Sequence, residues 1–145
     1  ETIMIHKNID KKDALKKTEH LLERVEIQNA NKVINYYPHQ LSGGMLQRAM
    51  IAMSIANRPD LLIADEPTTA LDVTIQMQIL DLLSQLQKKL GMTLLFISHD
   101  LSVVKKISYY VYVMKEGKII ENGSIASNLF FSFRILFIYF PMDWI

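Results

Sequence analysis

The chain of 145 residues contains no cysteine, which excludes disulfide bonds and cysteine-ligated metal sites. It also lacks an excess of either charge, since 16 lysines and arginines against 15 aspartates and glutamates leave a net charge of +1. This balance gives no electrostatic case for nucleic-acid binding. Residues 1–8 contain no long apolar run, so we expect no signal peptide there. The absence of cysteine fits a reducing compartment.

Half of the residues are hydrophobic, which is enough to form a core in a chain of about one domain. The chain begins with Glu1 rather than methionine. We therefore expect it to be a piece of a longer protein.

The segment from Leu41 to Arg48 organises the chain. Ser42 is a good helix N-cap, and Gly43 and Gly44 let a ligand approach the backbone closely. The first turn of a helix presents unpaired N–H groups that can hold an anion, so this segment is a candidate phosphate site. An ordinary capped helix is the alternative interpretation.

Two helices are predicted in the first 60 residues. Asp10 is a candidate N-cap of a helix ending near Val25, with an inward face of Ala14, Leu15, Thr18, Leu21, Leu22 and Val25. A polar connector is expected over 27–40. The second helix starts at Ser42 and ends before Pro59, and its expected core face is Leu46, Ala49, Met50, Met53 and Ala56.

Two apolar runs further along predict strands buried on both faces of a parallel sheet. Residues 61–64 stop at Asp65 and Glu66, and residues 93–97 stop at Ser98 and His99. A helix from about Thr74 to Leu90, ended by Gly91, separates them. Strand, helix and strand form a βαβ unit, so Asp65, Glu66 and His99 should meet at one edge of the sheet.

The last third of the chain is less informative. We expect a short helix over 101–107, a β-hairpin over 110–121 that turns at 115–118, and a further turn at Asn122-Gly123. The run from Leu129 to Phe140 is apolar but too short to span a membrane as a helix. It is compatible with a buried helix, with a strand or with a sequence not selected to fold here, and we assign it no function.

Four motifs now stand in order along the chain: Leu41–Met45 (LSGGM), Leu61–Pro67 (LLIADEP), Thr68–Asp72 (TTALD) and Ser98–Asp100 (SHD). They resemble the signature motif, Walker B motif, D-loop and H-loop of an ABC-transporter nucleotide-binding domain. The sequence that flanks these motifs (YPHQ before the signature and PTTALDVTIQ from the end of Walker B) is most similar to the dipeptide/oligopeptide importer branch. Nickel and glutathione importers are similar here.

The resemblance implies an α/β fold, a partial P-loop NTPase (RecA-like) parallel sheet core with the ABC helical subdomain. Residues 1–60 would form the helical subdomain, and 61–124 the second part of the ATPase core. Residues 125–145 would be an atypical apolar tail.

The resemblance also implies roles at the sheet edge, with ATP and Mg²⁺ as cofactors. Asp65 would hold Mg²⁺ through water, Glu66 would orient or deprotonate the attacking water, and His99 would contact the γ-phosphate. A solvated Asp-Glu turn and a histidine satisfied by ordinary polar contacts are the alternatives for these positions.

A second set of residues would act on ATP held by a partner subunit: Ser42, Gly43, Gly44 and Gln47 in the signature and Asp72 in the D-loop. Asp72 as a simple N-cap of the following helix is the alternative. The implied partners are a second ATPase subunit and membrane permease subunits, with no nucleic acid. The implied location is peripheral, at the cytoplasmic face of the inner membrane.

The implied function is that of an ATP-hydrolysing subunit energising peptide uptake. One alternative is a truncated, inactive remnant or non-catalytic binding fragment of such a subunit. Another is a soluble ABC-type ATPase of DNA repair or translation, against which the neutral charge and the importer-like wording argue.

The family's phosphate cradle, G-x-x-x-x-G-K-[ST], is absent, because the first glycine of the chain is Gly43. Phosphoryl transfer depends on positioning and charge stabilisation of the phosphates. We therefore predict that the 145-residue chain by itself hydrolyses no ATP above background in a phosphate-release assay. A turnover that disappears in a Glu66→Gln variant would contradict this prediction.

Overall fold

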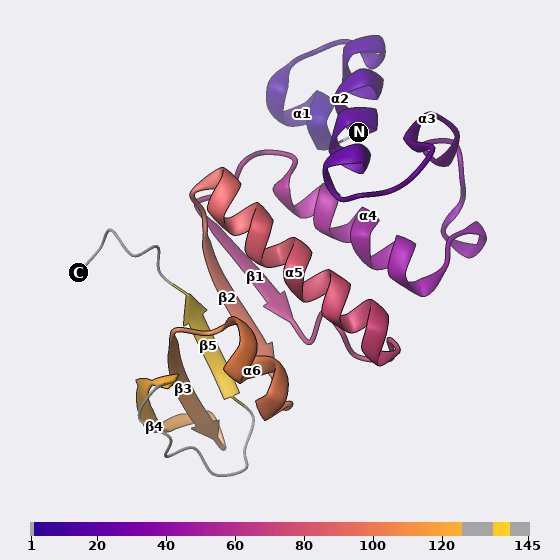
Figure 1. Cartoon of the computed structure of the whole chain (residues 1–145). Helices are drawn as coiled ribbons and strands as arrows, with labels where there is room; N and C mark the ends of the chain where they lie inside the picture. Colours follow the sequence, from indigo (N-terminus) through magenta and orange to yellow (C-terminus); the bar gives the residue numbers. More distant parts are fainter. Residues whose placement is uncertain (1, 126–134, 140–145) are drawn as a thin grey trace. The chain divides into compact units, whose positions relative to one another are not determined.

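The structure is a computed structural model that describes residues 2–125 and 135–139. It divides into two compact units (Figure 1). The first unit holds the residues up to Pro59 together with Leu71–Ile79, and the second holds Asp60–Ala70 and the described residues from Leu80 onward. Each unit is described by itself below.

The first unit is helical. Its elements are α1 (Thr2–Lys7), α2 (Lys11–Arg24), α3 (Ala30–Val33), the 3₁₀ turn η1 (Pro38–Gln40), α4 (Gly43–Ile55) and the start of α5 (Val73–Leu90). The backbone N–H of Asp13 donates to Asp10 Oδ1 at 2.8 Å, so Asp10 caps α2 as predicted. The connector expected over 27–40 differs, because it forms α3 and η1 and buries Ile27, Ala30 and Val33.

The buried face of α4 is not the predicted one. Met50 and Met53 are 53% and 67% exposed, whereas Ile51, Ala52 and Ile55 are buried. α4 carries apolar residues all round, so helical periodicity alone does not select its inward face. Leu15 of α2 is likewise 46% exposed, although Ala14, Leu22 and Val25 are buried as expected.

A buried arginine joins α4 to the end of α2. Arg48 is only 9% exposed, and its Nη1 donates to the carbonyl of Val25 at 2.9 Å and to Glu26 Oε2 at 2.8 Å. Val25 ends α2, so the guanidinium satisfies a helix-terminal carbonyl that has no partner inside the helix. This structural role of Arg48 was not predicted from the sequence.

The second unit contains a five-stranded sheet in the order β1-β2-β5-β3-β4. Its strands are β1 (Leu61–Asp65), β2 (Thr93–Ser98), β3 (Tyr110–Lys115), β4 (Lys118–Ser124) and β5 (Ile135–Tyr139), and α6 (Leu101–Ile107) follows β2. β1 and β2 are parallel, which confirms the predicted βαβ unit through α5, and Gly91 ends α5 with a φ of 65°. The other pairings are antiparallel.

The hairpin of β3 and β4 turns at Glu116-Gly117, both with positive φ, as the sequence predicted. The second turn expected at Asn122-Gly123 is wrong, since both residues pair with β3 inside β4. Within the apolar run from 129 to 140, residues 135–139 form β5, and the rest of that run lies outside the described residues.

β1 lies at the edge of the sheet and is buried on one face only. Leu62 and Ala64 are buried, but Leu61 and Ile63 are 48% and 58% exposed. The prediction of burial on both faces is wrong for β1, because nothing among the described residues covers the face that carries Leu61 and Ile63. β1 therefore presents an open strand edge and exposed apolar surface.

Of the helices that the structure describes, none combines the length and apolarity needed to cross a membrane.

The open edge predicts that the 145-residue chain associates in solution. Replacing Ile63 by threonine should reduce this association in sedimentation velocity, because threonine keeps the strand preference and removes exposed apolar surface. The matched change Leu62→Thr, at a buried neighbour, should instead lower the free energy of unfolding by about 2 kcal/mol or more. A wild-type chain that is monomeric and melts sharply would contradict the first expectation.

The buried arginine predicts a second effect on stability. Arg48→Met keeps the chain length and helix preference but leaves the Val25 carbonyl without its donor, so the free energy of unfolding should fall by about 1–3 kcal/mol. Urea unfolding in the Ile63→Thr background would measure it. Arg24→Met, at a more exposed arginine of the same unit, is the control and should change stability by less than about 0.5 kcal/mol. Equal losses for the two variants would show that the buried bonds contribute nothing particular.

Candidate functional site

The carboxyl ends of β1 and β2 bring together two of the predicted site residues. Asp65 pairs with Ile97 in the parallel register, and the backbone N–H of Glu66 donates to the Ile97 carbonyl at 2.9 Å. The next residue past β2 is His99, whose Nδ1 lies 2.9 Å from Glu66 Oε1. The meeting of Glu66 and His99 at one sheet edge is therefore as expected from the sequence.

A tight turn formed by the residues that follow Glu66 in the chain also holds this residue in place. Its φ of 45° turns the chain away from the sheet, and the Thr69 N–H donates to the Glu66 carbonyl at 3.1 Å. The Thr69 hydroxyl donates to Glu66 Oε2 at 2.8 Å. Both carboxylate oxygens thus have a hydrogen-bond partner. Thr69 was not predicted from the sequence, although a hydroxyl residue three positions after a carboxylate, with Pro67 between them, is a recognisable turn signal.

The pair is open to solvent, since the side chains of His99 and Glu66 are 66% and 30% exposed. An ionised carboxylate only accepts hydrogen bonds, so His99 Nδ1 carries the hydrogen in this pair. Nε2 of the ring then donates to an anion only when the imidazole is protonated. Chemically, the pair offers a carboxylate that can take a proton from water and a ring that can meet a phosphate oxygen.

Asp65 is the candidate metal ligand at this edge of the sheet. It ends β1 on the exposed side of the strand. Within residues 2–125 and 135–139, no group of three or more histidine, aspartate or glutamate side chains could hold a metal by itself. Mg²⁺ is commonly bound by one or two carboxylates together with waters and substrate phosphates, so an exposed Asp65 beside Glu66 fits a nucleotide-borne Mg²⁺.

The remaining site residues lie in the first unit. Ser42 caps α4, since its Oγ accepts from the Met45 N–H at 3.2 Å. Gly43 is exposed and Gln47 is half-buried on the same helix. Asp72 accepts from the Ile75 N–H at 3.0 Å, so it caps α5, which was one of its two interpretations.

The two glycines differ in the room around them. A Cβ on Gly43 would meet Leu71 Cδ2 at 3.4 Å, an ordinary contact, whereas a Cβ on Gly44 would lie 2.8 Å from Ile75 Cγ2. The start of α4 therefore packs directly on the start of α5. This contact was not predicted from the sequence.

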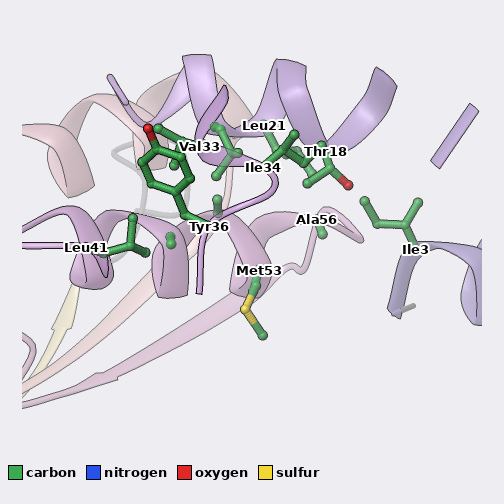
Figure 2. Close-up of a pocket in the computed structure, with 12 residues that line it drawn as sticks. Ile3, Thr18, Leu21, Val33, Ile34, Tyr36, Leu41, Met53 and Ala56 are labelled. Carbon is green, nitrogen blue, oxygen red and sulfur yellow. The ribbon is translucent and has the colours of Figure 1, made fainter. Parts of the chain in front are cut away.

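A cavity of about 420 Å³ lies elsewhere in the first unit (Figure 2). Its lining is largely apolar and comes from α1, α2, α3, α4 and the segment between α3 and α4. Ile3, Leu21, Val33, Tyr36, Leu41 and Met53 are among the lining residues. The hydroxyl of Thr18 at its wall donates to the Ala14 carbonyl at 2.8 Å. With no charged side chain in its wall, this cavity offers no ligand for a phosphate or a metal.

Comparison with known proteins agrees with these motifs. Residues 1–69 match the model of the ABC transporter family. The chain is 50% identical over 125 residues to the glutathione import ATP-binding protein GsiA of Escherichia coli K12, covering 86% of this chain and 20% of that protein. It is 53% identical over 125 residues to the peptidoglycan transport ATP-binding protein YejF of Agrobacterium fabrum, covering 86% and 23%.

Solved structures agree with the fold. A dimeric ATP-binding cassette, MJ0796, in a post-hydrolysis state bound to ADP and Pi, matches with a TM-score of 0.69 and 30% identity over 81% of this chain and 49% of that one. The structure of cbiO1 from Clostridium perfringens, part of an ABC transporter complex, matches with a TM-score of 0.72 and 32% identity over 85% and 48%. These matches confirm the predicted α/β fold of the P-loop NTPase class.

The chain spans about a fifth of the length of these curated relatives and about half of the solved chains. The sequence matches, the structural matches and the order of the four motifs all agree. The chain is therefore similar, over most of its length, to part of the ATP-binding domain of ABC transporter ATPases.

Proposed function

We propose that the chain is part of the ATP-hydrolysing subunit of an ABC importer for peptides. The observation that carries this proposal is the contact of His99 Nδ1 with Glu66 Oε1 at 2.9 Å, beyond the ends of two parallel strands. Ligands bind at this edge in open α/β sheets. The names of the relatives support a substrate of the peptide class, since one imports glutathione and another transports peptidoglycan.

Glu66 is the proposed general base or orienting group for the attacking water. Its carboxylate is held through Oε1 by His99 and through Oε2 by Thr69, so its orientation is set before any substrate arrives. Such preorganisation is what phosphoryl transfer demands of the protein, because positioning supplies most of the catalysis. His99, exposed at the same edge, is the proposed contact of the γ-phosphate.

Asp65 is the proposed Mg²⁺ residue, acting through a bound water. When bound with ATP, Mg²⁺ neutralises charge that develops on the phosphate oxygens. Asp65 contributes an exposed carboxylate to this role, at the end of the strand that also positions Glu66.

The proposed contacts to ATP held by a second ATPase subunit are Ser42, Gly43, Gly44, Gln47 and Asp72. The start of α4 supports this role, because Gly43 is exposed and the first-turn N–H groups of a helix attract anions. The Ser42 hydroxyl accepts from the Met45 N–H and keeps its own hydrogen for donation to a phosphate oxygen. A dimeric relative is consistent with a shared site.

Membrane permease subunits are the other proposed partners, at the cytoplasmic face of the inner membrane, where the subunit would be peripheral. The support is the naming of relatives as import or transport ATP-binding proteins. Substrate choice among peptides, glutathione and nickel would then rest with the permease and its binding partners.

The test is to join this chain to an amino-side ABC segment that carries G-x-x-x-x-G-K-[ST]; we name the product the completed domain. We expect the completed domain to hydrolyse ATP, and Glu66→Gln to lower kcat by about 100-fold or more, because it removes the proton acceptor. Phosphate release measures both rates.

The matched control is Glu116→Gln, a change of the same kind in the exposed turn between β3 and β4, which should leave kcat within about twofold. A folded but inactive completed domain would favour the alternative of a non-catalytic fragment. An unchanged rate in Glu66→Gln would remove Glu66 from the mechanism.

A further inference from the structure

The first turns of α4 and α5 approach each other so closely that a side chain at Gly44 would force Ile75 or its helix to shift. A Cβ built there lies 2.8 Å from Ile75 Cγ2, a distance that real Cβ atoms essentially never show. We propose that Gly44 and Ile75 interlock, that the segment Ser42–Gly44 and Asp72 therefore behave as one rigid piece, and that Ile75 is the positioning residue of that piece. The consequence for ATP contact rests on the proposed function.

Ile75 is suited to this role because it contacts both segments. Its backbone N–H donates to Asp72 Oδ1 at 3.0 Å, and its side chain lies against Gly44. On the α4 side, the Ser42 hydroxyl is held by the Met45 N–H at 3.2 Å. A single residue thus ties the two candidate nucleotide-contacting segments of this unit together.

Two further contacts extend the same packing in register. Gly43 lies against Leu71, at 3.4 Å for a built Cβ, and Arg48 Nη2 donates to Gln78 Oε1 at 3.4 Å. The paired positions 43/71, 44/75 and 48/78 advance in the same direction along the chain. The start of α5 therefore packs alongside α4 in parallel, and Arg48 anchors that packing to Val25 and Glu26.

Backbone conformation does not explain the glycine at position 44. Gly44 lies inside α4, and positive φ among the described glycines occurs at Gly91 and Gly117. Gly44 is the second residue of α4, and its helical backbone could be formed by alanine, which is the better helix former. The close approach of Ile75 supplies a reason that lies within this chain and is independent of any bound nucleotide.

The interlock is tested by thermal unfolding of the completed domain without nucleotide. Gly44→Ala should lower Tm by about 3–10 °C, since an overpacked contact costs more than the gained helix preference. Gly44→Ala combined with Ile75→Ala, which removes Cγ2 and Cδ1, should recover at least half of that loss. Gly43→Ala is the matched control and should not lower Tm, because its Cβ has ordinary contact distance.

The positioning role is tested by kinetics of the same protein. Ile75→Ala should raise the KM for ATP about fivefold with kcat within twofold, and Ile75→Val, which keeps Cγ2, should restore KM. Thr74→Ala, at the exposed neighbouring position, should change neither value.

A Tm that is unchanged or raised in Gly44→Ala, or not recovered by Ile75→Ala, would overturn the interlock. A KM that is unaffected by Ile75→Ala would overturn the positioning role. If the completed domain proves inactive, the proposed function fails, but the Tm comparison still decides the interlock, because it needs no nucleotide.

Discussion

The parallel pairing of β1 with β2 is the constraint on which the sheet-edge site depends. The register that places Asp65 opposite Ile97 also lets the Glu66 N–H continue the ladder by one bond, to the Ile97 carbonyl. Glu66 follows β1 directly, and His99 follows β2 directly. Their side chains therefore lie side by side, with His99 Nδ1 2.9 Å from Glu66 Oε1. A slip of one residue would turn the side chains of β1 to the opposite face of the sheet. The burial of Leu62 and Ala64 on one face of β1 therefore helps to fix the register that brings Glu66 and His99 together.

Those parts of the fold that local signals determine could be predicted from the sequence. The preferences of single residues explain four of these features: the helix caps at Asp10 and Ser42, the end of α5 at Gly91 and the turn at Glu116-Gly117. The inward face of α4 could not be predicted, because isoleucines and methionines lie on different sides of that helix and only tertiary packing chooses between them. The exposure of one face of β1 could not be predicted for the same reason, because a uniformly apolar strand sequence does not indicate how many of its faces are covered.

One part of the candidate site could be predicted from the sequence, and another part could not. The meeting of Glu66 and His99 follows from topology alone, since parallel strands deliver their carboxyl ends to one edge. Thr69 was not predicted because hydroxyl residues in turns are common, and only the observed 2.8 Å bond distinguishes this one. Arg48 was not predicted because its partners Val25 and Glu26 lie more than twenty positions away, and no local pattern encodes such a contact.

Helix capping and nucleotide contact are compatible at Ser42 and Asp72, and this affects how their hydrogen bonds are interpreted. Ser42 uses an acceptor site of its hydroxyl for the Met45 N–H, so capping leaves the donor of that hydroxyl to act on a phosphate. Asp72 uses Oδ1 for the Ile75 N–H, and its carboxylate has a second oxygen. The caps hold both side chains in one orientation, which lowers the entropy that a ligand contact must overcome. Because Ile75 joins the two segments, the cap of α5 and the start of α4 are ordered together. The hydrogen bonds that cap the two helices therefore also fix the orientation of side chains that we propose as nucleotide contacts.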